Sequence, residues 1–244
     1  MKTAIKISDL TKQYKDVTAV DKLNLEIYEG ELFSLLGVNG AGKTTTIKML
    51  ATLVKPTSGD ADIFNYSILK DEERIKEIID ISMQETAIAR KLTVEENIEF
   101  YGELSGLDKK ELNETKKAIY ESFGFDKIAK KQASKLSGGW QRKLSIALAL
   151  ISKPKILFLD EPTLGLDVIA RRELWKNINE LKGKMTIILT THYMEEAEAL
   201  SDRIGIMKDG ELLFVGTKEE LFSKTGKTNV EDSFIEIVSG GQLS

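Results

Sequence analysis

The sequence predicts an α/β fold with a mostly parallel core sheet, an N-terminal antiparallel β subdomain and an inserted α-helical subdomain. Three observations favour this fold. Largely apolar runs at residues 32–36, 155–160 and 185–190 are typical of central parallel strands, which are buried on both faces. Strands that alternate apolar and polar residues precede these runs. Residues 87–152 follow a helical pattern instead.

The first part of the chain is predicted to build both sheets. Residues 5–8 and 23–28 alternate apolar and polar side chains, as half-buried antiparallel strands do. The glycine-rich segment 37–45 follows the first apolar run and leads into a helix. The apolar face of this helix is formed by Ile47, Leu50, Ala51 and Val54. Two further strands are expected near residues 61–64 and at 78–83.

Helices are expected between residues 87 and 152. Thr93 with Glu96, and Asp108 with Glu111, match the capping box, in which two side chains satisfy free amides at a helix start. The first helix is expected to bury Val94, Ile98, Tyr101 and Leu104. The last helix of this segment is expected to bury Leu144, Ala147, Leu148 and Ile151.

The sheet is predicted to resume after the helical segment. The two later apolar runs read as parallel strands with a helix between them. Asp209 and Gly210 separate two more apolar strands, which predicts a two-residue hairpin. A final helix is expected from near Asn229. Its apolar residues are Phe234, Ile235 and Val238.

Composition limits the classes of function. The chain has 244 residues, which suffices to bury a full core without disulfides or metals. It has no cysteine, which excludes disulfides and thiolate chemistry and suits a reducing compartment. The formal charge is −4 and no basic stripe with interleaved aromatics is present, so nucleic-acid binding is not expected. No apolar run approaches the roughly 18 residues that cross a bilayer, so we expect no direct membrane insertion.

The segment from Gly37 to Thr45 is predicted to bind a polyphosphate. It fits the phosphate-binding-loop pattern G-x-x-x-x-G-K-[ST] at every fixed position, between a strand and a helix. Glycines let backbone amides approach phosphate oxygens, and the helix start adds free amides and a positive dipole end. Lys43 is expected to reach the β- and γ-phosphates, and the Thr44 hydroxyl to ligate Mg²⁺. The predicted nucleotide-binding residues of this loop are Gly37, Asn39, Gly40, Gly42, Lys43, Thr44 and Thr45.

Polar side chains follow several strands. Asp160 and Glu161 end a buried strand, where open α/β sheets bind ligands. Asp160 is expected to hold Mg²⁺, directly or through water, and Glu161 to orient or deprotonate the water that attacks the γ-phosphate. His192, the only histidine, is a candidate to contact the γ-phosphate and fix that water. Gln84 ends another strand, and Tyr14 is either a base-stacking residue or an edge-strand aromatic.

A second anion site is predicted at Ser137, Gly138 and Gly139. A hydroxyl, two glycine amides and a helix start meet there, and one nucleotide does not need both this segment and the phosphate loop. At this point the sequence, with Leu136 to Arg142 reading LSGGWQR, resembles the nucleotide-binding subunits of ATP-binding cassette (ABC) transporters. Their signature loop reads Leu-Ser-Gly-Gly, followed usually by Gln, Met or Glu. The resemblance covers nearly the whole chain.

The resemblance implies a phosphate-loop NTPase with a RecA-like core and assigns roles to single residues. Tyr14 falls where the family stacks adenine, and Gln84 where a glutamine contacts Mg²⁺ and senses the permease. Asp167 looks like the aspartate of the family's dimer-contact loop, and His192 matches the switch histidine. Trp140 departs from the family, since the fifth signature position is usually slimmer or more polar. We favour an indole that covers the helix edge over one that crowds the partner's nucleotide.

The resemblance also implies partners, cofactors and a domain layout. Two subunits would hold two molecules of ATP, with Mg²⁺, head to tail, and Lys43 of one chain and Ser137 of the other would contact each γ-phosphate. The implied partners are a transmembrane permease and a second copy or a homologous ATPase subunit, on the cytoplasmic face of the cell membrane. The domain layout that we expect is an ATPase domain at 1–224, with its core at 1–86 and 153–224 and its helical subdomain at 87–152, and a helical extension at 225–244.

Within the family, the sequence looks most like subunits that energise exporters of drugs, antibiotics, sodium or polysaccharides. Two alternatives stay open. One is an ABC ATPase without a transport role, such as a cofactor-assembly ATPase. The other is a small-molecule kinase or GTPase that shares only the phosphate loop. The second anion site and the absence of an Asn-Lys-x-Asp segment argue against the kinase or GTPase.

Overall fold

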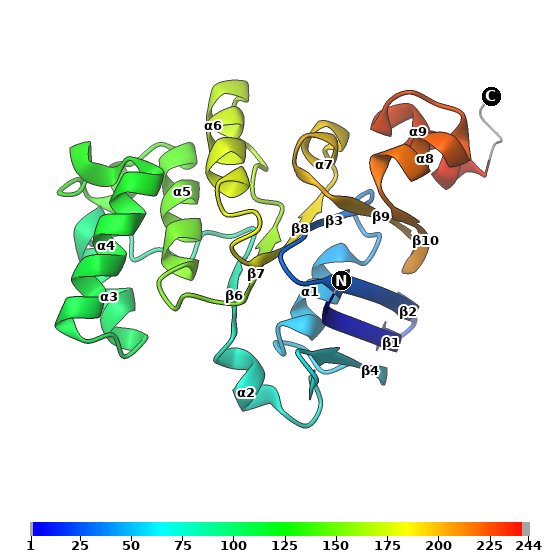
Figure 1. Ribbon diagram of the computed structural model, residues 1–244, viewed down its shortest axis with the longest axis horizontal. Helices are drawn as coiled ribbons and strands as arrows, with labels where there is room; N and C mark the ends of the chain where they lie inside the picture. Colours follow the sequence, from blue (N-terminus) through cyan, green and yellow to red (C-terminus); the bar gives the residue numbers. More distant parts are fainter. Residues whose placement is uncertain (1, 241–244) are drawn as a thin grey trace.

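Two sheets and an inserted layer of helices make up the structure, a computed structural model that describes residues 2–240 (Figure 1). The smaller sheet is antiparallel, and its strand order is β2-β1-β4-β5. Its strands are β1 (Thr3–Tyr14), β2 (Val17–Tyr28), β4 (Ser58–Ile63) and β5 (Tyr66–Ser67). The predicted antiparallel N-terminal strands are therefore confirmed.

The larger sheet has the order β10-β9-β3-β8-β7-β6 and is parallel except for its edge strand β10. Its strands are β3 (Leu32–Leu36), β6 (Ile79–Ser82), β7 (Ile156–Asp160), β8 (Thr186–Thr191), β9 (Arg203–Lys208) and β10 (Glu211–Gly216). All predicted strands of the core are present. Asp209 and Gly210 both have positive φ, of 50° and 85°, so the predicted hairpin is formed by a two-residue turn.

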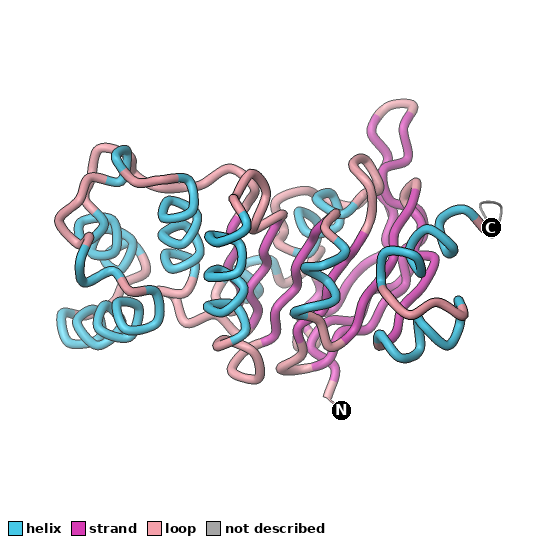
Figure 2. The backbone as a smooth tube through the Cα atoms, turned by 90° about the horizontal axis from the view of Figure 1, so that it is seen from above, coloured by secondary structure: helices cyan, strands magenta, loops and turns pink. Residues whose placement is uncertain are grey.

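The central strands are apolar throughout because both of their faces are covered. Helix α1 (Lys43–Leu50) and the antiparallel sheet cover one face, where Phe33 and Phe158 are fully buried. Helices α5 (Gly138–Ala149) and α6 (Val168–Asn179) cover the other face, which includes Leu157 and Leu189. Alternate residues of one strand thus enter different cores. Figure 2 shows the central strands between these helices.

The helical insert contains α3 (Val94–Leu104), α4 (Lys109–Phe123) and α5, with two short 3₁₀ turns at Phe125–Lys127 and Ala133–Lys135. Both predicted capping boxes are present. The predicted buried face of α5 is confirmed, because its members are all buried. The expectation for Leu104 is wrong, since this side chain is 68% exposed. Leu104 is the last residue of α3, and α4 packs instead at Gly102, against Leu112.

The C-terminal part packs against the core sheet. Helices α7 (Met194–Leu200), α8 (Lys218–Thr225) and α9 (Val230–Ser239) share one apolar cluster with the end of β3. Asn229 caps α9 as predicted, and Phe234 is buried, whereas Ile235 is 42% exposed. The last four residues of the expected extension, 241–244, lie outside the described residues. Short α2 (Glu72–Lys76), α7, α8 and β5 are additional to the predicted elements.

Within residues 2–240, no helix combines the length and the apolar character that a membrane span requires.

Candidate functional site

Four neighbouring strands of the core sheet bring the predicted site residues to one edge. In the order β3, β8, β7 and β6, their carboxyl ends lead into the phosphate loop, His192, the pair Asp160 and Glu161, and Gln84. These parallel strands end at the same side of the sheet, so residues from distant parts of the sequence converge there. The residues predicted to bind nucleotide and Mg²⁺ at the ends of these strands therefore lie along one edge of the sheet.

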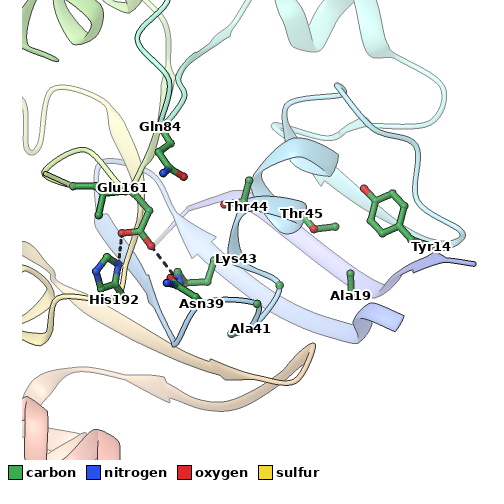
Figure 3. Close-up of a pocket in the computed structure, with 13 residues that line it drawn as sticks. Tyr14, Ala19, Asn39, Ala41, Lys43, Thr44, Thr45, Gln84, Glu161 and His192 are labelled. Carbon is green, nitrogen blue, oxygen red and sulfur yellow. Dashed lines mark hydrogen bonds and ion pairs between the residues drawn. The ribbon is translucent and has the colours of Figure 1, made fainter. Parts of the chain in front are cut away.

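The phosphate loop turns at Gly40 and Gly42, whose φ angles are 83° and 105°. Only glycine adopts these angles without strain. Gly42 directly precedes α1, whose start has no side-chain cap, so the first amides of the helix stay available. The Lys43 side chain is 5% exposed, and its Nζ donates hydrogen bonds to the carbonyls of Gly37, at 2.7 Å, and Val38, at 3.2 Å. The loop thus presents amides and one ammonium toward a common space (Figure 3).

At Gly37, close packing rather than the backbone angle requires glycine. Its φ lies outside the left-handed region, but a Cβ at this position would stand 2.4 Å from the carbonyl oxygen of Met207 on β9. The glycine therefore allows close packing between the loop and the neighbouring strand. Its own carbonyl holds Lys43.

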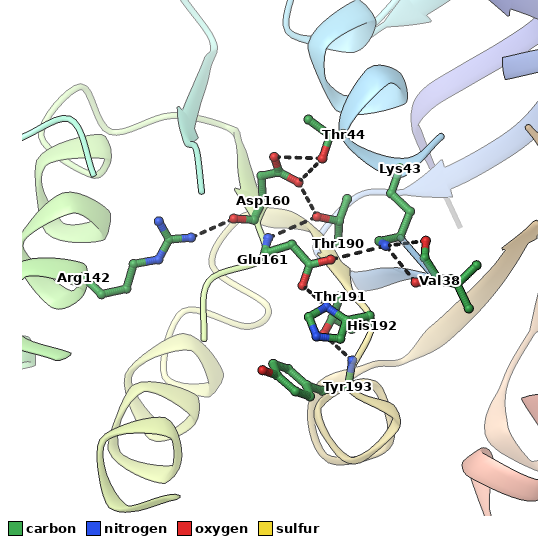
Figure 4. Close-up of polar contacts among 11 residues, drawn as sticks. Val38, Lys43, Thr44, Arg142, Asp160, Glu161, Thr190, Thr191, His192 and Tyr193 are labelled. Atoms are coloured by element: carbon green, nitrogen blue, oxygen red, sulfur yellow. Dashed lines mark hydrogen bonds and ion pairs between the residues drawn. The ribbon is translucent and has the colours of Figure 1, made fainter. Parts of the chain in front are cut away.

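Glu161 lies between Lys43 and His192 (Figure 4). Its Oε1 is 3.2 Å from Lys43 Nζ, and its Oε2 is 2.7 Å from His192 Nδ1. The Glu161 side chain is almost fully buried, with 7% exposure. Its backbone φ is 48°, in the left-handed region that is unfavourable for a residue with a Cβ. Such strain persists only where the surroundings hold it, and it is common at functional sites.

Asp160 is fully buried and is linked to α1. Thr44 Oγ1 donates to its two carboxylate oxygens, at 2.9 and 3.1 Å, and Thr190 Oγ1 donates to Oδ1 at 2.6 Å. The hydroxyl of Thr44 and the carboxylate of Asp160 are oxygen donors of the kind that Mg²⁺ takes from proteins in nucleotide sites. These two residues therefore fit the predicted metal.

A cavity of about 500 Å³ joins most of the predicted residues (Figure 3). Those that line it are Tyr14, Asn39, Gly40, Gly42, Lys43, Thr44, Thr45, Gln84, Glu161 and His192. Tyr14 lies at the far end of this cavity from His192, is 45% exposed, and has Lys12 Nζ 4.9 Å from its ring centroid. The cavity thus has an ionic end and an aromatic end.

The second predicted anion site is separate from this cavity. Ser137, Gly139 and Asp167 line a smaller pocket of about 230 Å³. The Ser137 side chain makes no cap bond to its helix, whereas Asp167 Oδ1 accepts from two amides at the start of α6. Gly138 is exposed, with no atom of another residue near a Cβ placed there. The two segments predicted to bind anions therefore line different pockets of one chain.

Trp140 turns toward the helical subdomain. Its ring centroid lies 6.0 Å from that of Phe125, and Lys143 Nζ stands 4.7 Å from the indole centroid. Lys143 also pairs with Glu173 on α6, at 2.8 Å. These contacts favour the interpretation that the indole covers the edge of α5.

Arg142 is a site residue that sequence reasoning missed. Its guanidinium is 4% exposed and donates to backbone carbonyls on either side of Glu161 and after β6. Burial lowers the pKa of Arg142 to about 10, although the carboxylates of Asp160, Glu196 and Glu161 oppose this shift. The sequence offered one signal that Arg142 is buried. Arg142 and Lys143 are adjacent basic residues at the start of a helix that is otherwise apolar and rich in alanine.

A phosphate loop at the end of one parallel strand, with two carboxylates at the end of another, defines the class of phosphate-loop nucleoside triphosphatases. The family model described as ABC transporter matches residues 20–164. The chain belongs to the ABC transporter family, as an ATP-binding subunit with the α/β fold of the ABC ATPases.

Curated relatives agree with this assignment. "Phospholipid-transporting ATPase ABCA3" of Homo sapiens is 44% identical over 226 residues, which are 91% of this chain and 13% of that protein. "Linearmycin resistance ATP-binding protein LnrL" of Bacillus subtilis (strain 168) is 38% identical over 238 residues, which are 97% of this chain and 75% of that protein. The chain therefore spans a small part of the first relative and most of the second.

Solved structures share the fold. "Structure of ATP binding subunit of ABC transporter" has a TM-score of 0.86 and 26% identity, and covers 97% of this chain and 100% of that one. "Dimeric Structure of MJ0796, a Bacterial ABC Transporter Cassette" has a TM-score of 0.78 and 28% identity, and covers 87% of this chain and 98% of that one.

Proposed function

We propose that this chain binds and hydrolyses ATP in order to drive export through a separate transmembrane permease, on the cytoplasmic face of the membrane. The observation that carries the proposal is the division of the anion-binding groups. Lys43, Glu161 and His192 share one cavity, whereas Ser137 and Gly139 line another. A site of this kind is completed by a second subunit.

ATP binding is assigned to the large cavity. Its aromatic end, at Tyr14, would stack the base, and the amides of the phosphate loop with Lys43 would hold the phosphates. Thr44, Asp160 and Gln84 would hold Mg²⁺, which neutralises charge on the phosphate oxygens when it is bound. In the structure, the Lys43 ammonium pairs with Glu161 at 3.2 Å. A bound γ-phosphate would compete for Lys43 and release Glu161 from this pair.

Hydrolysis is assigned to Glu161 and His192. Glu161, once released from Lys43, is the base that orients or deprotonates the attacking water. His192 Nδ1 lies 2.7 Å from the Glu161 carboxylate. A protonated His192 would donate to this carboxylate from Nδ1 and to the γ-phosphate from its other ring nitrogen. Glu161 and His192 would thus orient the attacking water and the γ-phosphate relative to each other.

Dimerisation is assigned to the second anion site. Ser137, Gly138 and Gly139 of one subunit would close on the ATP held by Lys43 of the other, so that two subunits enclose two nucleotides head to tail. A hydrogen bond to a charged group contributes about 1.5–3 kcal/mol, so removal of the γ-phosphate weakens the closed dimer. The solved structure described above as dimeric supports the association of two such chains.

Export is supported by the relatives. One is described as a linearmycin resistance protein and another as a phospholipid-transporting ATPase. We infer that the permease of this chain carries a drug, an antibiotic or a lipid-like compound. A permease docked beside Gln84 and the helical subdomain would convert opening of the dimer into motion of the transport path.

The deciding experiment is the Glu161→Gln substitution. The variant should bind ATP as the wild type does, lose about 100-fold or more in turnover, and accumulate as an ATP-bound dimer. ATPase assays, nucleotide-binding titrations and light scattering after size-exclusion chromatography measure these three properties. Glu85→Gln, in the loop after Gln84, is a matched control because it removes an equal charge outside the cavity lining. Wild-type turnover in Glu161→Gln would refute the assigned role.

A further inference from the structure

Arg142 bonds to two loops of the site at once. On one side, its Nε donates to the Pro162 carbonyl at 2.8 Å and its Nη2 to the Asp160 carbonyl at 2.7 Å. On the other side, its Nη1 donates to the Met83 carbonyl and, at 3.3 Å, to the Gln84 carbonyl. One guanidinium therefore holds the backbone on both sides of Glu161 and the backbone that carries Gln84. Figure 4 shows its bond to Asp160.

The chemistry of the guanidinium makes this contact specific. Arginine presents five donors in a rigid plane, so a single side chain can bond to carbonyls that lie in different directions. Lysine carries the same charge at one point and cannot span the same set. The Asp160 and Pro162 carbonyls flank Glu161, whose left-handed φ of 48° needs support from its surroundings. Arg142 supplies that support from outside the strand.

The helix that carries Arg142 is also the helix that carries the second anion site. Ser137 precedes α5 directly, and Gly139 and Arg142 lie in its first two turns. A helix moves as a rigid body over so short a distance. Binding of a partner's nucleotide by Ser137 and Gly139 would move α5. Arg142 would then transmit this movement to the backbone of Glu161 and of Gln84.

We propose that Arg142 is a positioning residue for hydrolysis, which sets the backbone of Glu161 and of Gln84 from the signature helix α5. The proposal rests on the proposed function, in which Glu161 activates the attacking water. Arg142 does not line the large cavity, and its hydrogen bonds go to backbone carbonyls. Its loss should therefore lower turnover while nucleotide binding is retained.

The test uses Arg142→Lys and Arg142→Gln in the full chain, with turnover expressed per folded protein. We expect kcat to fall about 10- to 100-fold, as for a misplaced catalytic group, and the ATP dissociation constant to change by less than about threefold. Arg203→Lys is the matched control. Arg203 is half-buried and, like Arg142, bonds to a backbone carbonyl, that of Glu26. It also bonds to the Glu31 carboxylate and lies at the opposite end of the sheet. It should lower the melting temperature without lowering kcat.

A double-mutant cycle with Glu161→Gln separates positioning from general damage. Residues that act as a unit give non-additive effects, so Arg142→Lys should lower the residual single-turnover rate of Glu161→Gln by less than about threefold. An equal fold-loss in both backgrounds, or wild-type kcat in Arg142→Lys, would overturn the proposal. Wild-type turnover in Glu161→Gln alone would instead overturn the proposed function on which it rests.

Discussion

Lys43 is held in the site by several contacts of its own chain. Its ammonium is almost fully buried, bonds to two loop carbonyls and pairs with Glu161. A buried cation without partners would be costly, and the loop carbonyls and Glu161 supply those partners. The residue types at this site were predictable from the motif. The pairing of Lys43 with Glu161 was not, because it depends on how two distant strands end.

Replacement of Lys43 by Ala should abolish most of the affinity for ATP. The phosphate charge then enters a buried site without its cation, and removal of one partner from a buried pair costs about 3–5 kcal/mol, or about 100-fold or more in the dissociation constant. Isothermal titration with ATP and Mg²⁺ measures this loss. Lys48→Ala, on the same helix but facing away from the cavity lining, should bind normally. Wild-type affinity in Lys43→Ala would contradict the proposed phosphate cradle.

Glu196 is the buried titratable residue behind the site. It is fully buried on α7, and its Oε1 accepts a hydrogen bond from Trp175 Nε1 at 2.9 Å. Burial raises the pKa of Glu196 above the ordinary 4.5, an effect that the hydrogen bonds from neighbouring hydroxyls and the indole oppose. A raised folded-state pKa contributes stability at low pH that is lost as pH rises through the folded pKa.

Glu196→Gln should therefore stabilise the protein more at higher pH than at lower pH. The amide keeps an acceptor for Trp175 but carries no charge to desolvate. Urea unfolding at about pH 5 and about pH 8 measures the difference in unfolding free energy between variant and wild type at each pH. That difference should grow with pH. A difference that is constant or that shrinks with pH would show that the raised pKa has no effect on stability.

At the scale of elements, α5 explains both a success and a failure of the sequence prediction. Its apolar stripe predicts the face that enters the helical core, and the stripe is buried. However, the helix is buried on nearly all sides from Arg142 to Ala149, because α3, α6 and β6 also pack around it. A periodic pattern describes one covered face only. Arg142 therefore looked like a solvated residue although it lies inside.

Substitution of Trp140 tests the role of the indole at the edge of the same helix, α5. Its indole packs on Phe125 and beneath Lys143, so replacement by Met or Gln should lower stability by about 1–3 kcal/mol while ATPase turnover stays unchanged. Thermal unfolding and steady-state ATPase assays measure the two effects. Trp140→Phe, which keeps an aromatic ring against Phe125, should lose less stability. A clear rise in turnover in the Met and Gln variants would support the alternative, in which the indole crowds the partner's nucleotide.

At the scale of the whole molecule, local sequence signals determine the single strands and helices, whereas the strand order of the core sheet determines which residues form the site. Alternation, capping boxes and the Asp209-Gly210 turn are local signals, and they predict strands, helices and a hairpin that the structure contains. The strand order β3-β8-β7-β6 is a long-range result, because it joins the two ends of the chain around the helical insert. That order sets which site residues share a cavity. The second anion site was predicted from its own residues, whereas its role in completing the site of another subunit was expected only through the family resemblance.

This division makes a strong prediction for mixtures of inactive subunits. In a head-to-tail dimer, each complete site takes Lys43 from one chain and Ser137 from the other. Lys43→Ala and Ser137→Ala homodimers both lack a complete site, but a mixed dimer regains one. Ser137→Ala is a suitable variant because the Ser137 side chain makes no cap bond to α5, so its removal spares the helix.

Equal amounts of the two variants, mixed as monomers before ATP is added, should therefore hydrolyse ATP faster than the average of the separate variants. Loss of a hydrogen bond to a charged phosphate oxygen lowers the separate Ser137→Ala rate by about 10- to 100-fold, so the recovery is measurable above it. The control mixes Lys43→Ala with the double variant Lys43→Ala/Ser137→Ala, in which no pairing restores Lys43 and no recovery is possible. If each chain formed a whole site by itself, the first mixture would give only the average rate, and the head-to-tail arrangement would be excluded.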